Sequence, residues 1–364
     1  MGSPIRTAIA GVGNCASSLV QAISYCKVKG DDAIGVSFPT LGGYRPEDIQ
    51  IVAGFDVDAR KVNRPIGEAV MAAPNCTEVF WDKLDDQPAT VHRGPDLDGV
   101  SSFMRNQAPE LSFVPSDVTP LTADEVVEAL KAAQAEVLII FLPVGSPQAV
   151  EFYADCALRA GCAVVNGIPV FLASNPVWAK KFKDAGLPLI GDDFKAQFGA
   201  TVVHRTLAHL ADMRGVKLDR TYQLNVGGNT DFLNMMDMDR LAMKRESKTE
   251  AVQAALDTRL GDGDIRIGPS DYVPWLHDRK VAYVRLEGRL LGGPRTSMEV
   301  RLEVEDSPNA AAMAISAIRC ARIAREKGMT GAIEDASAFL FKHPPVQFED
   351  SIAYDRLLAF AGDK

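Results

Sequence analysis

An apolar run near the N-terminus, residues 7–10, ends in a G-x-G-x-x-A turn at residues 11–16 and continues with a helical pattern. This strand–turn–helix unit is typical of a site that binds a dinucleotide pyrophosphate. Gly11 permits the tight bend, Gly13 leaves no side chain in the way of the phosphates, and Ala16 lets the helix pack on the strand. The helix N-terminus then presents free amides to the phosphates. The contacts expected from this turn are Gly11, Gly13, Asn14, Cys15 and Ala16.

A second apolar strand, residues 51–55, ends at Asp56. A carboxylate at this position accepts hydrogen bonds from ribose hydroxyls and disfavours the 2′-phosphate of NADP, so the two motifs together predict NAD. The gap from the turn to this acid is about twice the usual ~20 residues, and we interpret residues 27–48 as an insertion. The alternative is a glycine turn of purely structural role, because such turns also end ordinary strands.

Length and composition limit the classes of protein that this chain can belong to. A chain of 364 residues suggests two domains. The net charge of −9 argues against a nucleic-acid or membrane-surface partner. No apolar run approaches the ~20 residues that a membrane span needs. The six cysteines are scattered without a C-x-x-C pair, so we expect reduced thiols in a cytoplasmic protein.

The distribution of apolar residues predicts an α/β fold that changes character along the chain. In the first half, buried strands at 137–142, 163–166 and 187–190 alternate with helical patterns, which favours a mostly parallel sheet. In the second half, residues 298–305 alternate between apolar and charged side chains, and residues 281–287 precede them across a Gly-Gly-Pro turn. This pattern predicts antiparallel strands in a second domain. A helix should follow, with Ser307 as its N-cap.

Polar groups are concentrated in two segments that follow predicted strands. Asp192 and Asp193 come directly after the strand at 187–190, where ligand sites of open α/β sheets lie. One of these acids is expected to be functional and the other to cap a helix. The segment 225–234 contains two glycines and three asparagines, with Asp231 among them. A ligand-binding loop and a turn held by Asx hydrogen bonds are equally compatible with it.

Lysines mark the remaining candidate positions. Lys244 and Lys248 are four residues apart and would share one face of a helix, although a solvated face is the simpler interpretation. Lys280 lies at the start of the strand near 281, and Lys342 follows an apolar stretch. Grouped lysines neutralise phosphate, and a desolvated lysine can transfer protons. The histidines form no ligand cluster, so no metal site is predicted.

These segments carry a resemblance to a known family. The chain resembles the myo-inositol-1-phosphate synthases (inositol-3-phosphate synthases) of the actinobacterial type nearly from end to end. The most specific stretches are Gly11-Val12-Gly13-Asn14-Cys15-Ala16-Ser17-Ser18, Leu142-Pro143-Val144-Gly145-Ser146, Gly191-Asp192-Asp193, Leu224-Asn225-Val226-Gly227-Gly228-Asn229, Asp278-Arg279-Lys280 and Arg285-Leu286-Glu287-Gly288-Arg289. The resemblance implies a Rossmann NAD-binding domain, residues 1–200 plus 308–364. It also implies an inserted α+β domain, residues 201–307, for catalysis and tetramer contacts.

The resemblance also implies an activity. Glucose 6-phosphate would be oxidised at carbon 5, enolised, closed by an intramolecular aldol step and reduced again, giving 1D-myo-inositol 3-phosphate with no net redox change. Catalytic roles carried over from the family fall on Lys244, Lys280, Lys342, Lys248, Asp193 and Asn229. Substrate contacts fall on Asn225, Asp231, Lys248 and Lys280, and cofactor contacts extend to Asp56, Pro143, Gly145 and Asp192. The resemblance further implies a homotetramer, and some family members use a cation that this sequence does not demonstrate.

Departures from the family pattern leave alternatives open. Ala196 stands where members commonly have serine, and residues 242–247 differ from the usual lysine-rich stretch. A paralogue that cyclises another sugar phosphate, such as fructose 6-phosphate, to a five-membered cyclitol phosphate is the second hypothesis. A non-catalytic NAD-binding scaffold is the third, and an ordinary dehydrogenase would differ by accumulating NADH.

Overall fold

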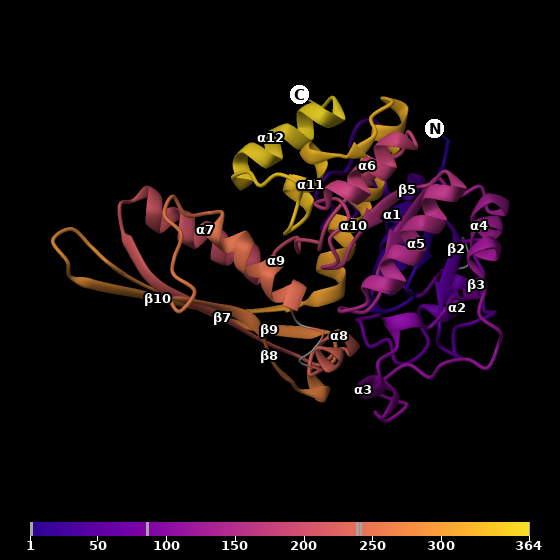
Figure 1. Ribbon diagram of the computed structural model, residues 1–364, viewed down its shortest axis with the longest axis horizontal. Helices are drawn as coiled ribbons and strands as arrows, with labels where there is room; N and C mark the ends of the chain where they lie inside the picture. The colour runs from indigo at the N-terminus through magenta and orange to yellow at the C-terminus, as the bar shows by residue number, and fades with distance from the viewer. Residues whose placement is uncertain (1–2, 85–86, 238–239, 241, 364) are drawn as a thin grey trace.

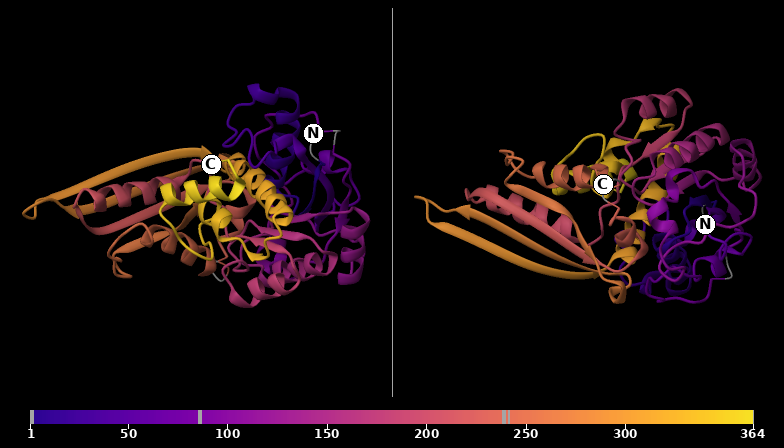
Figure 2. Two further views of the ribbon diagram at one scale, coloured as in Figure 1. Left: turned by 90° about the horizontal axis from the view of Figure 1, so that it is seen from above. Right: turned by 60° about the horizontal axis from the view of Figure 1, so that its bottom comes forward.

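The computed structural model describes residues 3–84, 87–237, 240 and 242–363, with the side chains of 242–244 and 269–270 outside that description. Two sheets organise the chain (Figure 1). A seven-stranded sheet lies within a layered body, and a four-stranded sheet extends from it as a long wing. Figure 2 shows the wing projecting from the body in both further views. No helix of the described residues is long and apolar enough to cross a membrane.

The seven-stranded sheet is parallel throughout, as the alternation of strand and helix patterns predicts. Its order is β11-β6-β5-β4-β1-β2-β3. The strands are β1 (Ile5–Ala10), β2 (Ile49–Asp56), β3 (Val91–Arg93), β4 (Val137–Ile140), β5 (Ala163–Asn166), β6 (Pro188–Ile190) and β11 (Gly331–Ala332). Every residue of β4, β5 and β6 is buried, because helices cover both faces of the sheet.

Helices form the outer layers of this body. On one face, α1 (Asn14–Lys29), α10 (Asp306–Glu326) and α11 (Glu334–Leu340) share a hydrophobic core with the sheet and α12 (Asp350–Ala361). On the other face, α4 (Ala123–Ala132), α5 (Pro147–Ala160) and α6 (Pro176–Asp184) form a second core. Two short helices, α2 (Ile66–Ala69) and α3 (Ser102–Arg105), interrupt the irregular segment between β2 and β4. All six cysteines are free, which confirms the prediction of unpaired thiols.

The wing contains the second sheet, in the order β10-β9-β7-β8. Its strands are β7 (Lys217–Gly227), β8 (Ile265–Tyr272), β9 (Arg279–Arg289) and β10 (Arg295–Glu305). The predicted antiparallel pairing of β9 and β10 is confirmed, with Val284 opposite Val300. The helices α7 (Ala200–Met213) and α9 (Ala242–Gln253) lie along one face, while α8 (Thr230–Asn234) follows β7 near the body (Figure 1).

The chain returns to the first sheet after the wing. Helix α10 begins at Asp306, so the predicted N-cap Ser307 is already inside the helix, and Glu305 occupies the N-cap position. Strand β11 then pairs with β6 at the sheet edge. Beyond α11, the Lys342 amide donates to the Asp193 carbonyl at 2.7 Å. The C-terminal segment is thereby placed against the loop that follows β6.

Candidate active site

The glycine turn has the geometry that a pyrophosphate contact requires. Gly11 has φ +93°, and a Cβ there would lie 2.6 Å from the Phe141 carbonyl oxygen, so only glycine fits. Gly13 has φ −91°, and a Cβ added there would meet nothing within 4 Å. The space beside Gly13, directly before the N-terminus of α1, is therefore free of other protein atoms. A phosphate can approach the backbone at this position without a steric barrier.

Asp56 lies in the wall of the same cavity. Its Oδ2 accepts a hydrogen bond from the Val12 amide at 2.7 Å, and its Oδ1 accepts from the amides of Val57 at 2.7 Å and Asp58 at 2.8 Å. A carboxylate offers about four lone-pair sites. These three bonds therefore fix its orientation and leave capacity for a hydroxyl donor such as ribose.

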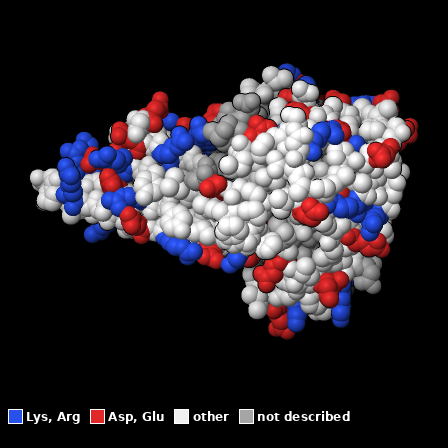
Figure 3. Space-filling view, turned by 90° about the horizontal axis from the view of Figure 1, so that it is seen from below, with Lys and Arg blue, Asp and Glu red and all other residues white. Residues whose placement is uncertain are grey.

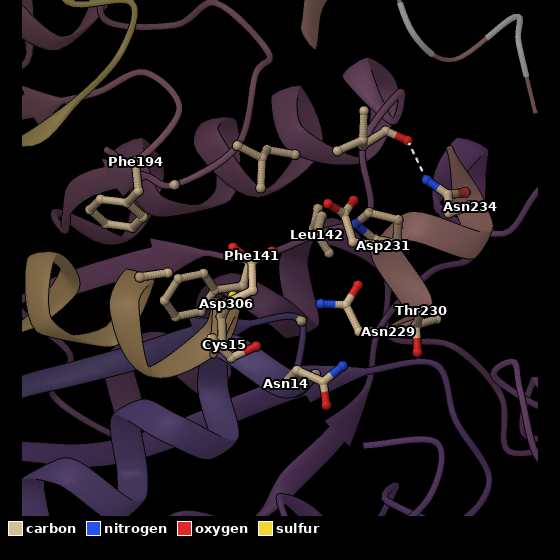
Figure 4. A pocket seen from close by; sticks show the side chains of 18 of the residues that line it. Asn14, Cys15, Phe141, Leu142, Phe194, Asn229, Thr230, Asp231, Asn234 and Asp306 are labelled. Atoms are coloured by element: carbon tan, nitrogen blue, oxygen red, sulfur yellow. Dashed lines mark hydrogen bonds between the residues drawn. The ribbon is translucent and has the colours of Figure 1, made fainter. Parts of the chain in front are cut away.

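Polar residues at the starts of α1 and α8 lie in the cavity wall and could bind a dinucleotide. Figure 4 shows Asn14 and Cys15, at the start of α1, on one side of the cavity and Asn229 and Asp231, at the start of α8, on the other. Asn234 donates from Nδ2 to the Val144 carbonyl at 2.9 Å. Its buried Oδ1 accepts no hydrogen bond from any described residue. A buried acceptor of this kind in a cavity wall favours a bound group that carries a donor.

Three of the predicted lysines line this same cavity from three different elements. Lys248 comes from α9, Lys280 from β9 and Lys342 from the segment after α11. Lys244 lies one helical turn before Lys248 on α9, but its side chain is outside the described residues. The three described ammonium groups face the cavity that also holds the glycine turn.

Carboxylates pair with two of these lysines, Lys342 and Lys280. Asp193 is 4 % exposed and accepts from Lys342 Nζ at 2.8 Å through Oδ1 and from Ser247 Oγ at 2.7 Å through Oδ2. Lys280 Nζ pairs with Asp306 Oδ1. Lys342 and Lys280 are thereby held in place in the cavity wall by opposite charges.

Asn229 caps α8, as one of the two interpretations of its segment predicts, and it also lines the cavity. Its Oδ1 accepts from the Phe232 amide at 3.1 Å and caps α8, while its Nδ2 donates to Asp278 Oδ1 at 2.9 Å. Asp278 also binds the hydroxyl of Ser307 at 2.8 Å. Burial, followed by the neighbouring charge of Asp306, raises the pKa of Asp278. Asn225, Asn229 and Asp231 all line the cavity.

Three predicted cofactor residues lie behind the cavity wall rather than in it. Asp192 is fully buried, and its oxygens accept from Asn166 Nδ2 at 2.7 Å and from Ser174 Oγ at 2.9 Å, as well as from backbone amides of residues 172–174. These bonds occupy the carboxylate, so Asp192 holds a loop. Gly145 permits close packing of Arg240, whose Cβ lies 2.5 Å from an added Cβ. Ala16 packs in the core, whereas Pro143 lines the cavity.

Some cavity residues carried no sequence signal. Lys61 is 3 % exposed and donates to the Val12 carbonyl at 2.8 Å and to Asn75 Oδ1 at 2.9 Å. Because Val12 lies within the glycine turn, the first of these bonds helps to fix the backbone of the turn. Burial lowers the pKa of Lys61. Gln223 reaches the cavity from β7. Among the described residues, no three His, Cys, Asp or Glu side chains are grouped as metal ligands.

A nucleotide-binding turn and a group of lysines share one cavity between a parallel sheet and a mixed sheet. This combination defines a dinucleotide-dependent α/β enzyme with an anionic substrate site. The profile of the myo-inositol-1-phosphate synthase family matches residues 199–307.

Relatives match the chain over almost its full length. It is 50% identical over 365 residues to inositol-3-phosphate synthase of Mycolicibacterium smegmatis, covering 98% of this chain and 97% of that protein. It is 49% identical over 368 residues to the Corynebacterium glutamicum enzyme of the same name, covering 98% of each. The chain belongs to the inositol-3-phosphate synthase family.

Solved structures agree with this assignment of the fold. The crystal structure of Ari2 is 35% identical in sequence, with a TM-score of 0.78 and 99% of each chain covered. A myo-inositol-1-phosphate synthase-related protein from Thermotoga maritima has a TM-score of 0.81 at 23% identity, covering 99% of this chain and 98% of that one. The predicted α/β fold, a parallel nucleotide-binding sheet with a second mixed-sheet unit, is confirmed.

Proposed function

We propose that this protein cyclises glucose 6-phosphate to 1D-myo-inositol 3-phosphate with NAD as a catalytic cofactor. One observation carries the proposal most directly. Lys248, Lys280 and Lys342 line the cavity that also contains Gly13, in a chain 50% identical to an inositol-3-phosphate synthase over 98% of its length. Oxidation, enolisation and aldol closure all move protons on or off oxygen, and ammonium groups stabilise the negative charge that develops there.

The substrate changes in steps that balance without an external oxidant. Carbon 5 loses the hydrogens of its secondary alcohol and becomes a ketone, which acidifies the protons of carbon 6. The carbon 6 enolate attacks the aldehyde at carbon 1, and the ketone is then reduced. The glycine turn at Gly11 and Gly13 and the carboxylate of Asp56 would hold NAD, which would supply the acceptor and later the donor of the carbon 5 hydride, so the net reaction is an isomerisation.

The family resemblance divides this work among the lysines and the polar side chains of the cavity. Lys342, held by Asp193, is assigned to proton transfer at the carbon 5 oxygen, together with Lys244. Lys280, paired with Asp306, is assigned with Lys248 to the charge of the enolate and the phosphate. Asn225, Asn229 and Asp231 orient the sugar hydroxyls. A carboxylate holds the ammonium group of Lys342 and of Lys280 in place beside the sugar.

The N-terminus of α7 supports a phosphate site beside these lysines. Gly199 is the N-cap and makes no side-chain capping bond, and residues 199–202 line the cavity. The first amides of a helix have no partner inside the helix and favour an anion. Ala196 also lines the cavity. The backbone amides of α7 replace the hydroxyl that a serine at position 196 would supply to the phosphate.

The products formed from two sugar phosphates distinguish the substrate hypotheses. Pure protein is incubated with NAD and either glucose 6-phosphate or fructose 6-phosphate, and NMR identifies the ring. A six-membered cyclitol phosphate from glucose 6-phosphate, without accumulation of NADH, is the expected result. A product from fructose 6-phosphate alone would refute the proposal in favour of a paralogue. Binding of NAD without conversion of either sugar would indicate a scaffold.

The uncovered face of the wing sheet supports self-association. Figure 3 looks onto this face, where charges of both signs surround an area with few charged residues. Leu224 and Tyr283 face each other across β7 and β9 and are 39% and 44% exposed. Such an apolar sheet face favours a second copy of the chain, and we propose a homotetramer. Light scattering coupled to gel filtration tests the mass, and Tyr283→Glu should lower it.

A further inference from the structure

A short antiparallel contact holds the backbone of Lys342 against the loop that follows β6. Phe194 of this loop lies opposite Phe341, and their rings stack with centroids 4.6 Å apart. The Lys342 amide donates to the Asp193 carbonyl at 2.7 Å, and the Lys195 amide donates to the carbonyl that precedes Phe341 at 2.9 Å. The place of Lys342 in the cavity wall therefore depends on where this loop and the C-terminal segment meet.

The side chain of Lys195 adds a second attachment between the same two segments. Its Nζ donates to the Ala338 carbonyl at 2.8 Å and to Asp350 Oδ1 at 2.9 Å. Asp350 Oδ2 accepts from Arg205 Nε at 3.2 Å, and Arg205 also donates to the Phe348 carbonyl at 3.0 Å. Asp350, at the start of α12, thus joins the loop after β6 to α7.

The charges of Lys195, Asp350 and Arg205, here called the Asp350 group, do not balance. Lys195 and Arg205 are 3% and 2% exposed. Among the described residues, Asp350 is the one carboxylate that pairs with either of these cations. Removal of one partner from a buried ion pair is strongly destabilising, because it leaves a buried charge uncompensated. Loss of Asp350 should therefore have the largest effect, since two buried cations would lose their shared counter-charge.

The same contacts decide which member of the group can change its charge. Burial lowers the pKa of Lys195 to about 8, although the charge of Asp350 opposes the shift and that of Arg205 adds to it. Burial alone would raise the pKa of Asp350, but Lys195 and Arg205 outweigh it, and that pKa is lowered. His209 and Glu349 lie at the same contact between α7 and α12, with His209 Nε2 3.2 Å from Glu349 Oε1. Lys195 is the cation of the group that loses its proton as the pH rises.

We propose that Lys195, Asp350 and Arg205 are positioning residues: the Asp350 group fixes the C-terminal segment against the loop after β6 and against α7, and so sets where Lys342 meets the sugar. The described lining of the cavity includes Ala196 and Lys342 but none of these three residues. A displacement of about 1 Å at a reacting group can reduce the rate by roughly a hundredfold. The role of Lys342 in this inference rests on the proposed function.

Three variants test the charge balance. Asp350→Asn keeps the size of the side chain but leaves two buried cations without a counter-charge, and kcat for glucose 6-phosphate should fall about tenfold or more. Lys195→Met should lose less, because Asp350 and Arg205 remain as a balanced pair. The double variant Lys195→Met/Asp350→Asn keeps one cation, and its kcat should exceed that of Asp350→Asn by about threefold or more. NAD affinity should be unchanged in all three. A double variant no more active than Asp350→Asn would overturn the inference.

The pH dependence tests the assignment to Lys195. In Asp350→Asn, Lys195 lacks the charge that raises its pKa, so it becomes neutral at a lower pH and its repulsion with Arg205 disappears. The ratio of the kcat of Asp350→Asn to that of the wild type should therefore rise between about pH 6 and pH 8.5. The double variant should show no such rise. His209 is present in both variants, so its own titration cancels in the comparison. An equal rise in both would contradict the assignment.

Two measurements distinguish position from stability. Leu130→Ala creates a cavity in the core beside α4, where Leu130 is 0% exposed. It should lower the melting temperature while kcat at 25 °C stays at the wild-type value. Hydrogen exchange of the Lys342 amide should be faster in Asp350→Asn and slower again in the double variant. Equal losses of kcat in Leu130→Ala and Asp350→Asn would overturn the inference. Exchange at Lys342 that is unchanged, or that rises by the same factor as in β4, would also overturn it.

Failure of the proposed function can be recognised separately, because hydrogen exchange needs no substrate. If the wild-type protein does not convert glucose 6-phosphate, the cyclisation proposal fails. Exchange of the Lys342 amide then still supports or overturns the role of the Asp350 group in placing this segment. If the wild-type protein converts the sugar and Asp350→Asn does so equally well, the positioning role fails and the proposed function stands.

Discussion

Substitution of alanine for Gly13 and for Gly11 should have different effects, because the added methyl groups would meet different surroundings. Gly13 has an extended backbone, and an added Cβ meets nothing within 4 Å. Gly13→Ala should lose about 1 kcal/mol as a poorer N-cap and regain about 0.4–1 kcal/mol from the restricted unfolded chain. The net change in unfolding free energy is therefore within about 1 kcal/mol. The methyl would instead occupy the space for the pyrophosphate.

The expected loss is in NAD affinity. Each hydrogen bond lost between a backbone amide and a charged phosphate is worth about 1.5–3 kcal/mol, or roughly tenfold to a hundredfold in Kd. Calorimetric titration with NAD measures this loss, and thermal unfolding measures stability. If Gly13→Ala binds NAD as tightly as the wild type, the cavity at this turn is not the pyrophosphate site.

Gly11→Ala is the matched control for the fold. Gly11 has φ +93°, and its added Cβ lies 2.6 Å from a backbone oxygen. The backbone strain and the steric overlap together should cost about 2–6 kcal/mol, a large part of the ~5–15 kcal/mol that stabilises a typical domain. Gly11→Ala should therefore melt well below Gly13→Ala. Equal melting temperatures would contradict the assignment of the two glycines.

Two further predictions concern the lysine group and pH. Lys342→Met should lower kcat by about 10²–10⁴-fold while NAD affinity is retained, as measured by the product assay and calorimetry; an equal loss of NAD affinity would contradict its assignment to the sugar. Burial lowers the pKa of His204 from 6.5 to about 4, so its stabilising contribution is complete above pH 6.5 and is lost as the pH falls toward 4. By pH 4 the lost contribution to the unfolding free energy amounts to about 3 kcal/mol. The melting temperature of His204→Asn should therefore fall less steeply between pH 6.5 and pH 4 than that of the wild type.

Local patterns predict much of this fold because each pattern has one physical cause. The run at 137–140 is buried on both faces, and continuous apolar residues predict a strand of that kind. The alternation at 298–305 predicts β10, because one face of that strand is polar. The expectation that lysines from distant segments lie near the glycine turn came from the family resemblance, and three of them line its cavity.

Residues whose partners are distant in sequence could not be predicted in this way. Ser307 has the local features of an N-cap, but its hydroxyl binds Asp278, 29 residues away, and the helix begins before it. Asp192 and Asp193 are adjacent and chemically identical, yet one holds a loop and the other a lysine. His204 gave no signal, because its partners lie on a neighbouring strand. Tertiary contacts decide such roles.

The C-terminal return of the chain to Asp193 has a consequence for synthesis of the protein on the ribosome. Lys342 is 149 residues away from the carboxylate that it pairs with, and it follows the last strand of both sheets. The glycine turn and all the strands of the wing are synthesised before that lysine. The ion pair between Lys342 and Asp193 can therefore form only after every strand of both sheets has been synthesised.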